Sequence, residues 1–257
     1  MVIESINIAE VLEPQRDIDN QTIINILQHG EIKLIGLMPW GSNHTFLVQV
    51  LYQDVTLNAI YKPSVGEHPL WDFTHGTLCR REVAAYQVSC ALETWVAVPY
   101  TILRDGPHGI GCLQQFIYAD YHIHYFTLKD NPQLQTKFQQ IVLFDYLINN
   151  ADRKGGHCLL DAHQKLWAID HGLSFHTDYK LKTVIWEYAN TKITETLYAD
   201  LQNFKKCLKS DSKLYQNLSE LLSSTEIAKI GHRLNILLNT GKFPKISGKY
   251  DYPYPPI

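Results

Sequence analysis

The sequence that decides the fold is NNADRKGGH at residues 149–157, taken together with LWAIDHG at residues 166–172. The first stretch follows a run of apolar residues with helical spacing, and the second begins as a short apolar strand. Each stretch carries one carboxylate, Asp152 or Asp170, close to the point where a regular element gives way to a loop. We therefore interpret the rest of the chain outward from these two aspartates.

The spacing of the two aspartates is typical of phosphoryl-transfer chemistry. That reaction needs one carboxylate beside the attacking hydroxyl and a second on the magnesium ion that bridges the phosphates. Protein kinases place these groups in H-R-D-x-x-x-x-N and D-F-G. Here Asp152 takes the place of the first carboxylate and Asp170 that of the second, while His157 stands where the motif has Asn. The pattern predicts Asp152 as the catalytic base and Asp170 as a metal ligand.

Periodicity divides the chain into a part rich in strands and a part rich in helices. A short helix, capped by Asp19 or Asn20 and ended by Gly30, comes first. The predicted strands are residues 32–37, 45–52, 55–61, 100–103 and 111–117, with a helix over 78–92. The remainder is mostly helical. This order predicts an α+β fold with a β-rich N-terminal lobe at 1–117 and a helical C-terminal lobe at 118–257.

Later segments carry recognisable helix ends. A helical stripe over residues 134–147 leads into the first stretch. Further on, Ser223 and Glu226 form a capping-box pattern, and Gly241 is expected to stop the helix that follows. The segment YDYPYPP at residues 250–256 either packs on the C-terminal lobe or binds a partner.

Composition bounds the class of protein and its partners. The 257 residues are 45% hydrophobic and 19% charged, which is ordinary for a folded soluble protein. The formal net charge of −3 gives no reason to expect nucleic acid or an anionic membrane as partner. No run approaches the ~20 apolar residues of a membrane span, and residues 1–14 do not have the pattern of a signal peptide. The scattered cysteines are interpreted as buried thiols in a reducing compartment, which predicts a cytoplasmic protein.

Candidate phosphate contacts lie in the strand-rich part. The connection between the first two strands carries Ser42, Asn43 and Thr45, whose polar groups can meet phosphate oxygens; a tight hairpin turn explains the same residues. Lys62 ends the third strand as the lysine of V-A-I-K does, and Glu82 on the next helix can pair with it. The alternatives are a strand-end lysine that reaches water and a glutamate on a solvated helix face.

The residues after Asp152 fit a catalytic loop. Lys154 can neutralise charge that builds on the transferred phosphoryl group, and Arg153 is expected to brace the loop by hydrogen bonding to a carboxylate or carbonyl. Gly155 and Gly156 permit backbone angles closed to other residues, so that the chain can turn sharply. A surface turn would use the same residue types.

Asp170 follows an apolar strand that should be buried. A carboxylate there is costly unless it is paired or bound to a metal, which supports its assignment as a ligand. An alternative from another class of protein is a metallohydrolase whose ligands come from a larger set of residues: His157, His163, Asp170, His171 and His176.

At these residues the sequence resembles the phosphatidylinositol 3-/4-kinase-like superfamily, which includes type II phosphatidylinositol 4-kinases and HipA-type protein kinases. It is most similar to a bacterial branch of that superfamily. The resemblance runs from about residue 34 to residue 186 and continues more faintly into the Pro-rich C-terminal segment. Its sharpest pieces are YKP at 61–63, REVAAY at 81–86, NADR at 150–153 and IDHGLSF at 169–175.

The resemblance implies a bilobal protein-kinase-like fold with ATP between the lobes and Mg²⁺ or Mn²⁺ as the metal. It implies that Lys62 contacts the phosphates and that Glu82 holds Lys62. It also implies that Asp152 is the catalytic carboxylate and Asp170 the magnesium ligand. The hinge beside adenine would be formed by the backbone of Gln114, Gln115, Phe116 and Ile117.

The chain departs from its relatives at two places. His157 replaces the usual metal-binding Asn, and imidazole suits zinc, manganese or iron better than magnesium. Arg153-Lys154 replaces the frequent Arg-His or Arg-Gly. We expect an ATP-dependent phosphotransferase whose acceptor is a protein hydroxyl or a small molecule. The alternative is a nucleotide-binding pseudokinase with a regulatory or scaffolding role, which His157 in the metal position would favour.

Overall fold

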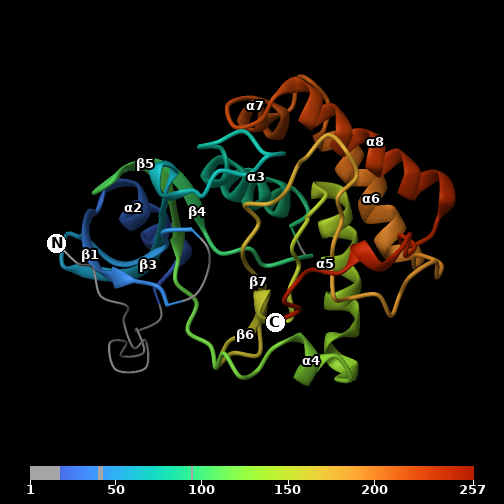
Figure 1. Cartoon of the computed structure of the whole chain (residues 1–257), viewed down its shortest axis with the longest axis horizontal. Coiled ribbons are helices and arrows are strands. Elements are labelled where there is room, and N and C mark those ends of the chain that lie inside the picture. The colour runs from blue at the N-terminus through green and yellow to red at the C-terminus, as the bar shows by residue number, and fades with distance from the viewer. Residues whose placement is uncertain (1–17, 40–42, 94) are drawn as a thin grey trace. The chain divides into compact units, whose positions relative to one another are not determined.

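The computed structural model describes residues 18–39, 43–93 and 95–257, and the chain falls into two compact units. The first unit combines the described residues up to Val83 with Pro99–Tyr118. The second combines Ala84–Val98 with Ala119–Ile257. A β-sheet dominates the first unit and helices dominate the second, as the ribbon shows (Figure 1). The α+β class predicted from the sequence is confirmed.

The first unit is a five-stranded antiparallel sheet with helix α2 (Asn20–His29) packed on one face. Asp19 caps this helix by accepting a hydrogen bond from the Thr22 amide, and Gly30 follows its last residue, as predicted. The strand order is β1-β2-β3-β5-β4. The bounds are β1 (Glu31–Leu37), β2 (Phe46–Tyr52), β3 (Val55–Pro63), β4 (Thr101–Gly106) and β5 (Gly109–Gln115).

Successive side chains of β3 lie alternately on the face of the sheet that packs on α2 and on the opposite face. Leu57, Ala59 and Tyr61 are buried in the apolar cluster that includes Ile26 and Leu27 of α2. Because successive side chains of a strand point to opposite faces, the even-numbered positions of β3 face away from α2. Lys62, at the end of the strand, is therefore carried by the face opposite to this core.

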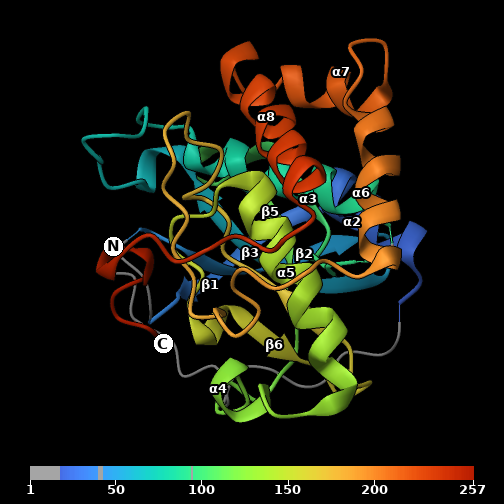
Figure 2. The ribbon, with the colours of Figure 1, turned by 90° about the vertical axis from the view of Figure 1, so that its right-hand side faces the viewer.

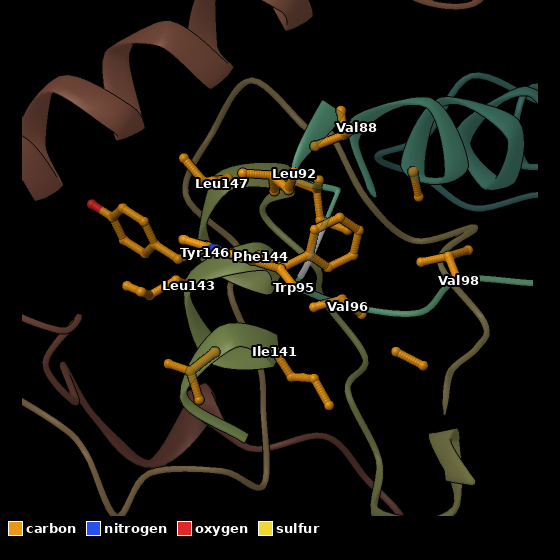
Figure 3. Packing of buried hydrophobic residues seen from close by; sticks show 14 of the residues in the cluster. Val88, Leu92, Trp95, Val96, Val98, Ile141, Leu143, Phe144, Tyr146 and Leu147 are labelled. Carbon is orange, nitrogen blue, oxygen red and sulfur yellow. The ribbon is translucent and has the colours of Figure 1, made fainter. Parts of the chain in front are cut away.

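The boundary between the units falls within helix α3 (Leu78–Ala91), between Val83 and Ala84. The sequence prediction placed residues 84–98 with the N-terminal lobe, whereas their packing places them with the helices. Figure 3 shows why: Val88, Leu92 and Trp95 lie in one apolar cluster with residues of α5, labelled Ile141, Leu143, Phe144, Tyr146 and Leu147. Burial of these side chains, rather than chain order, decides their membership.

The second unit is built around helix α5 (Gln135–Ile148), in which every residue from Gln140 to Ile148 is buried. Helices α6, α7 and α8 form one group within the unit, as the second view shows (Figure 2). The other elements are α4 (Tyr125–Leu128), α6 (Glu195–Cys207), α7 (Lys213–Ser219), α8 (Ser224–Thr240), and a hairpin of β6 (Cys158–Leu160) and β7 (Leu166–Ala168). Helix α8 packs on α5 and thereby covers part of this central helix.

Helix α8 forms where its end signals predicted. Ser223 caps it in a reciprocal capping box with Glu226, and Gly241 follows it in the left-handed conformation with φ of 60°. Such a cap satisfies two of the amides that have no partner inside the helix, those of Ser223 and Glu226. Among the described residues, no helix combines the length and apolarity required for a membrane crossing.

Candidate functional site

In the first unit, Lys62 and Glu82 form a close ion pair. The Lys62 Nζ lies 2.5 Å from Oε1 of Glu82, and the Glu82 side chain is 2% exposed. The glutamate is therefore not on a solvated helix face, and the ammonium of Lys62 is paired with it. A buried carboxylate needs a partner, so this pair fixes the amino group of Lys62 at the end of β3.

The connection between β1 and β2 is tied to the segment that follows β3. The Asn43 Oδ1 accepts a hydrogen bond from the amide of His68 at 2.8 Å, and the His44 amide donates to the carbonyl of Gly66. The Thr45 carbonyl accepts from Met38 and closes the turn. These contacts attach the connection to residues 66–68 and join its two ends.

Of the phosphate contacts predicted in this connection, Ser42 lies outside the described residues. Asn43 already uses its side-chain oxygen within the chain. An amide oxygen only accepts hydrogen bonds, so a phosphate oxygen would be contacted through Nδ2 of Asn43, and the His44 amide is engaged with Gly66.

The predicted hinge is formed by residues 114–117 at the end of β5. Two of its backbone amides are already hydrogen-bonded. The Gln115 amide donates to the carbonyl of Tyr100 at 2.8 Å, and the Phe116 amide donates to that of Asn58 at 3.1 Å. These two amides therefore serve the sheet and are not open to a nucleobase.

The other two hinge positions differ from each other. The side chain of Gln114 is buried, and its Nε2 donates to Oγ1 of Thr101 at 2.8 Å. Within the described residues, the Ile117 amide makes no hydrogen bond to another backbone carbonyl. Ile117 is thus the hinge position whose amide can donate to a ligand.

In the second unit, residues 149–157 form the aspartate loop, and Arg153 holds it in place. The guanidinium of Arg153 is fully buried and donates to both carboxylate oxygens of Asp145 on α5, at 2.8 and 2.9 Å. It also donates to the carbonyls of Ile169 at 2.8 Å and His157 at 3.3 Å, and contacts Nε2 of His171 at 2.7 Å. One side chain therefore ties α5 to the aspartate loop and to the segment after β7.

This pair remains charged although it is buried. Burial is the largest single influence and lowers the pKa of Arg153, but the charge and hydrogen bonding of Asp145, together with Cys158 and Asp170, raise the pKa above its ordinary value, so the guanidinium stays protonated. Removing either partner would leave an uncompensated buried charge, at a cost of about 3–5 kcal/mol. The bracing role predicted for Arg153 is confirmed. Its partner was missed because Asp145 fits the helical stripe, although a carboxylate in an apolar helix already signals a buried partner.

Two asparagines that the sequence prediction did not single out complete the loop. The side chain of Asn150 donates to Asp145 and accepts from the amide of Asp152, both at 2.9 Å. Asn149 ends α5 in the left-handed conformation, which asparagine tolerates better than most residues. Its side chain binds backbone groups of residues 176–180. The adjacent pair at the end of an apolar helix was the available signal.

Asp152 is partly buried and lies beside Lys154. The carboxylate is 22% exposed, and its Oδ2 is 3.3 Å from the ammonium of Lys154. Burial raises the pKa of Asp152 from 3.8 to about 6; Lys154 opposes this rise and the charge of Asp170 adds to it. The group is therefore ionised at neutral pH but close enough to its pKa to accept a proton.

Asp170 adopts a left-handed backbone conformation with φ of 61° directly after the strand segment, and its carboxylate is 47% exposed. The expectation that burial forces this carboxylate to find a partner is therefore wrong. Strand β7 ends at Ala168, and the turn at Asp170 takes the side chain out of the apolar layer. Its Oδ2 instead lies 3.4 Å from Nε2 of His157, so the structure brings these two predicted metal ligands together.

The His157 ring is oriented by the backbone of the loop. Its Nδ1 accepts from the amide of Lys154 at 3.4 Å, which places the ring hydrogen on Nε2, facing Asp170. Two ligands of one octahedral cation, each ~2.1 Å from it, are about 3 Å apart. The His157–Asp170 separation fits that geometry once Nε2 gives up its hydrogen.

The glycines of the aspartate loop are needed for space, not for backbone angle. Neither Gly155 nor Gly156 has a positive φ, so the expectation that both supply angles closed to other residues is wrong. A Cβ on Gly155 would lie 2.8 Å from the ring of Phe126 and 3.5 Å from the carbonyl oxygen of Pro256, whereas one on Gly156 would meet nothing. Gly155 is thus required by close packing.

The histidines of the metallohydrolase alternative do not converge. Among the residues that the structure describes, no three His, Cys, Asp or Glu side chains gather as a metal site. His171 is fully buried, and because a guanidinium only donates, its Nε2 must accept from Arg153. That nitrogen is therefore used inside the protein.

Comparisons with known proteins place this architecture in a family. The family model described as HipA-like kinase matches residues 91–226. Protein Rv2133c of Mycobacterium tuberculosis (strain ATCC 25618 / H37Rv) is 33% identical in an alignment that spans 90% of this chain and 94% of the relative. The crystal structure of the Helicobacter pylori proinflammatory kinase CtkA is similar with a TM-score of 0.50 at 11% identity, over 83% of this chain and 94% of that one. The structural likeness shows a kinase-like fold.

The raised pKa of Asp152 predicts that its carboxylate costs stability. Because its pKa is higher in the folded protein than in the unfolded chain, the cost is small near pH 4 and grows as the pH rises through about 6. Asp152→Asn should therefore raise the free energy of unfolding at pH 8 by about 1–3 kcal/mol, and by much less at pH 4. Denaturant unfolding at both pH values measures this.

Asp178→Asn is the matched control, because the Asp178 side chain is 84% exposed. We expect no pH-dependent gain for it. The quantity to compare is the free energy of unfolding of Asp152→Asn minus that of the parent. If this difference is the same at pH 8 as at pH 4, burial does not raise the pKa of this carboxylate.

The packing around Gly155 predicts an asymmetry between the two glycines. Gly155→Ala should lower the free energy of unfolding by about 1–3 kcal/mol, because the new methyl group overlaps the Phe126 ring. Gly156→Ala should change it by less than about 0.5 kcal/mol. Denaturant unfolding of the two variants side by side checks this, and equal effects would contradict it.

Proposed function

Because the chain belongs to the HipA-like kinase family, we propose that it is an ATP-dependent phosphotransferase, of the phosphatidylinositol 3-/4-kinase-like type, acting on a hydroxyl group of a protein or small molecule. The observation that carries this proposal is the position of Arg153. It holds the loop of Asp152 to Ile169 and His171, the two neighbours of Asp170. A proposed base and a proposed metal ligand, far apart in sequence, are thus braced by one buried side chain.

Asp152 has the properties that the proposed base requires. Its carboxylate would accept a hydrogen bond from the acceptor hydroxyl and take its proton while the new O–P bond forms and the bond to the leaving ADP oxygen breaks. A pKa of about 6 leaves it ionised at neutral pH. Lys154, 3.3 Å away, keeps a positive charge beside the reacting groups.

In the first unit, three sets of groups would contact the nucleotide. Lys62, held by Glu82, presents an ammonium to the phosphates. The backbone of residues 114–117 would contact adenine, with the Ile117 amide as the donor that the sheet does not use. The connection that carries Asn43 and Thr45 would contribute amides to the phosphates.

His157 and Asp170 would hold the divalent cation, Mg²⁺ or Mn²⁺. Magnesium sites commonly use one or two protein ligands together with substrate phosphates and water, so a pair of ligands suffices. The observed separation of 3.4 Å between Nε2 and Oδ2 fits such a pair. When bound, the cation would neutralise charge on the phosphates.

The proposal is tested by ATP turnover with Mg²⁺ or Mn²⁺ in the parent and in Asp152→Asn, Asp170→Asn and Lys62→Met. We expect each variant to lose at least about 100-fold in turnover, which is the order of magnitude that one acid–base or charge-stabilising group contributes. Thermal stabilisation by ATP would follow binding separately. Asp178→Asn, with its exposed carboxylate, is the control that should keep full turnover.

Outcomes of this experiment separate the candidate functions. ATP-dependent stabilisation of the parent without turnover under either metal would select the nucleotide-binding pseudokinase. Unchanged turnover in Lys62→Met or Asp170→Asn would sink the assignment of the site. If the parent turns over ATP, transfer of labelled phosphate from ATP to components of a cell extract identifies the acceptor.

A separate prediction concerns the metal preference. If His157 is a ligand, His157→Asn should keep turnover and shift the ratio of activity with Mg²⁺ to that with Mn²⁺ toward Mg²⁺, because an amide oxygen suits magnesium better than imidazole does. Metal titrations of parent and variant measure the ratio. An unchanged ratio would leave His157 as a hydrogen-bond donor to Asp170 only.

A further inference from the structure

The Tyr/Pro-rich segment near the C-terminal end packs on the second unit through a defined turn. We call residues 247–257 the C-terminal strap. The buried carboxylate of Asp251 accepts hydrogen bonds from the amides of Ser247 and Gly248, which closes a turn at the start of the strap. Of the two alternatives left open by the sequence, packing on the helical part is the one observed.

One end of the strap is anchored next to Arg153. The Asp251 carbonyl accepts from the amide of Thr183 at 3.0 Å and from the indole of Trp186 at 3.3 Å. Residues 182–184 in turn pair with Arg153, whose amide donates to Lys182 and whose carbonyl accepts from Val184. The strap, the segment beneath it and the aspartate loop are thus joined by successive backbone hydrogen bonds.

The other end of the strap reaches the aspartate loop directly. The carbonyl of Pro256 accepts from the amide of Gly155 at 2.8 Å. Gly155 is buried, with Phe126 on one side and Pro256 close by, so a side chain has no room there. Gly155 lies between Lys154 and His157, and a contact that fixes it limits the movement of both.

Ring contacts and backbone hydrogen bonds together attach the strap. Tyr254 is 94% exposed, whereas the ring of Tyr252, itself 46% exposed, lies edge-on to Trp186 at 6.4 Å, and Pro253 is buried. The backbone hydrogen bonds at Asp251 and Pro256 add to these contacts. The strap is therefore tied both to the segment that pairs with Arg153 and to Gly155 of the aspartate loop.

We propose that the C-terminal strap is a positioning segment for phosphoryl transfer: through the Pro256–Gly155 contact it fixes the part of the aspartate loop that carries Lys154 and His157. This inference rests on the proposed function, since positioning has an effect on turnover only in a working site. A displacement of about 1 Å in such a group can reduce a rate by about 100-fold. Loss of the strap should therefore reduce kcat and leave the KM for ATP nearly unchanged.

Three shortened chains test the strap. A variant that ends at Pro255 lacks the Pro256 carbonyl that accepts from Gly155. A variant that ends at Asp251 lacks, in addition, residues 252–255, which connect the two attachments. The matched control ends at Pro256, which removes Ile257 but keeps an oxygen acceptor for the Gly155 amide. Tyr254→Ala is a further control, because its ring is exposed. For each protein, kcat, the KM for ATP and the hydrogen exchange of residues 153–158 are measured.

We expect the variants that end at Pro255 and Asp251 to lose about 10- to 100-fold in kcat and to exchange the amides of residues 153–158 faster. The two controls should match the parent in both measurements. A synthetic peptide of residues 252–257, which the variant that ends at Asp251 lacks, should restore part of both when it is added to that variant.

Unchanged exchange in the variant that ends at Pro255 would overturn the proposal, because the contact would then not hold the loop. Faster exchange with unchanged kcat would also overturn it, because the loop would be held without any consequence for the reaction. If the parent has no turnover, the proposed function fails instead, and the exchange measurement still decides whether the strap orders the loop.

Discussion

The pairing of Arg153 with Asp145 is the interaction on which the second unit depends. Two charges without solvent contact are stable only while each satisfies the other, so α5 and the aspartate loop cannot separate without a large cost. The remaining donors of the same guanidinium reach the segment that carries Asp170. Because a guanidinium is planar and offers five donors in fixed directions, it can join three segments where a lysine could not.

A similar principle operates in the first unit. Glu82 is almost completely buried, and Lys62 is the cation that compensates its charge. The alternation of β3 between a core face and an opposite face brings the lysine to that partner. In both units, then, a buried carboxylate fixes the position of a basic side chain, and the proposed function assigns a role to each position: Lys62 to the phosphates, and the loop of Arg153 to the base and the metal.

Much of the architecture followed from local patterns. Asp19 and Gly30 bound the first helix, the five strands of the first unit lie within a few residues of the predicted ranges, and the capping box of Ser223 and Glu226 begins α8. Such signals depend on neighbours in the chain, so the sequence contains them completely. The prediction differed from the structure where distant residues decide: residues 84–98 join the helical unit because their apolar side chains pack against α5.

By itself, the sequence determined the α+β class and the order of the first-unit strands, and it singled out the two aspartates as candidates, because periodicity, caps and motif spacing are properties of the chain. Only the tertiary structure decided that Asp170 is half exposed, that Gly155 is a glycine for lack of space, and that Asp145 is the partner of Arg153. It alone also brought Pro256 to Gly155. Each of these depends on atoms far apart in sequence, whose contacts exist only when the burial of the whole unit brings them together.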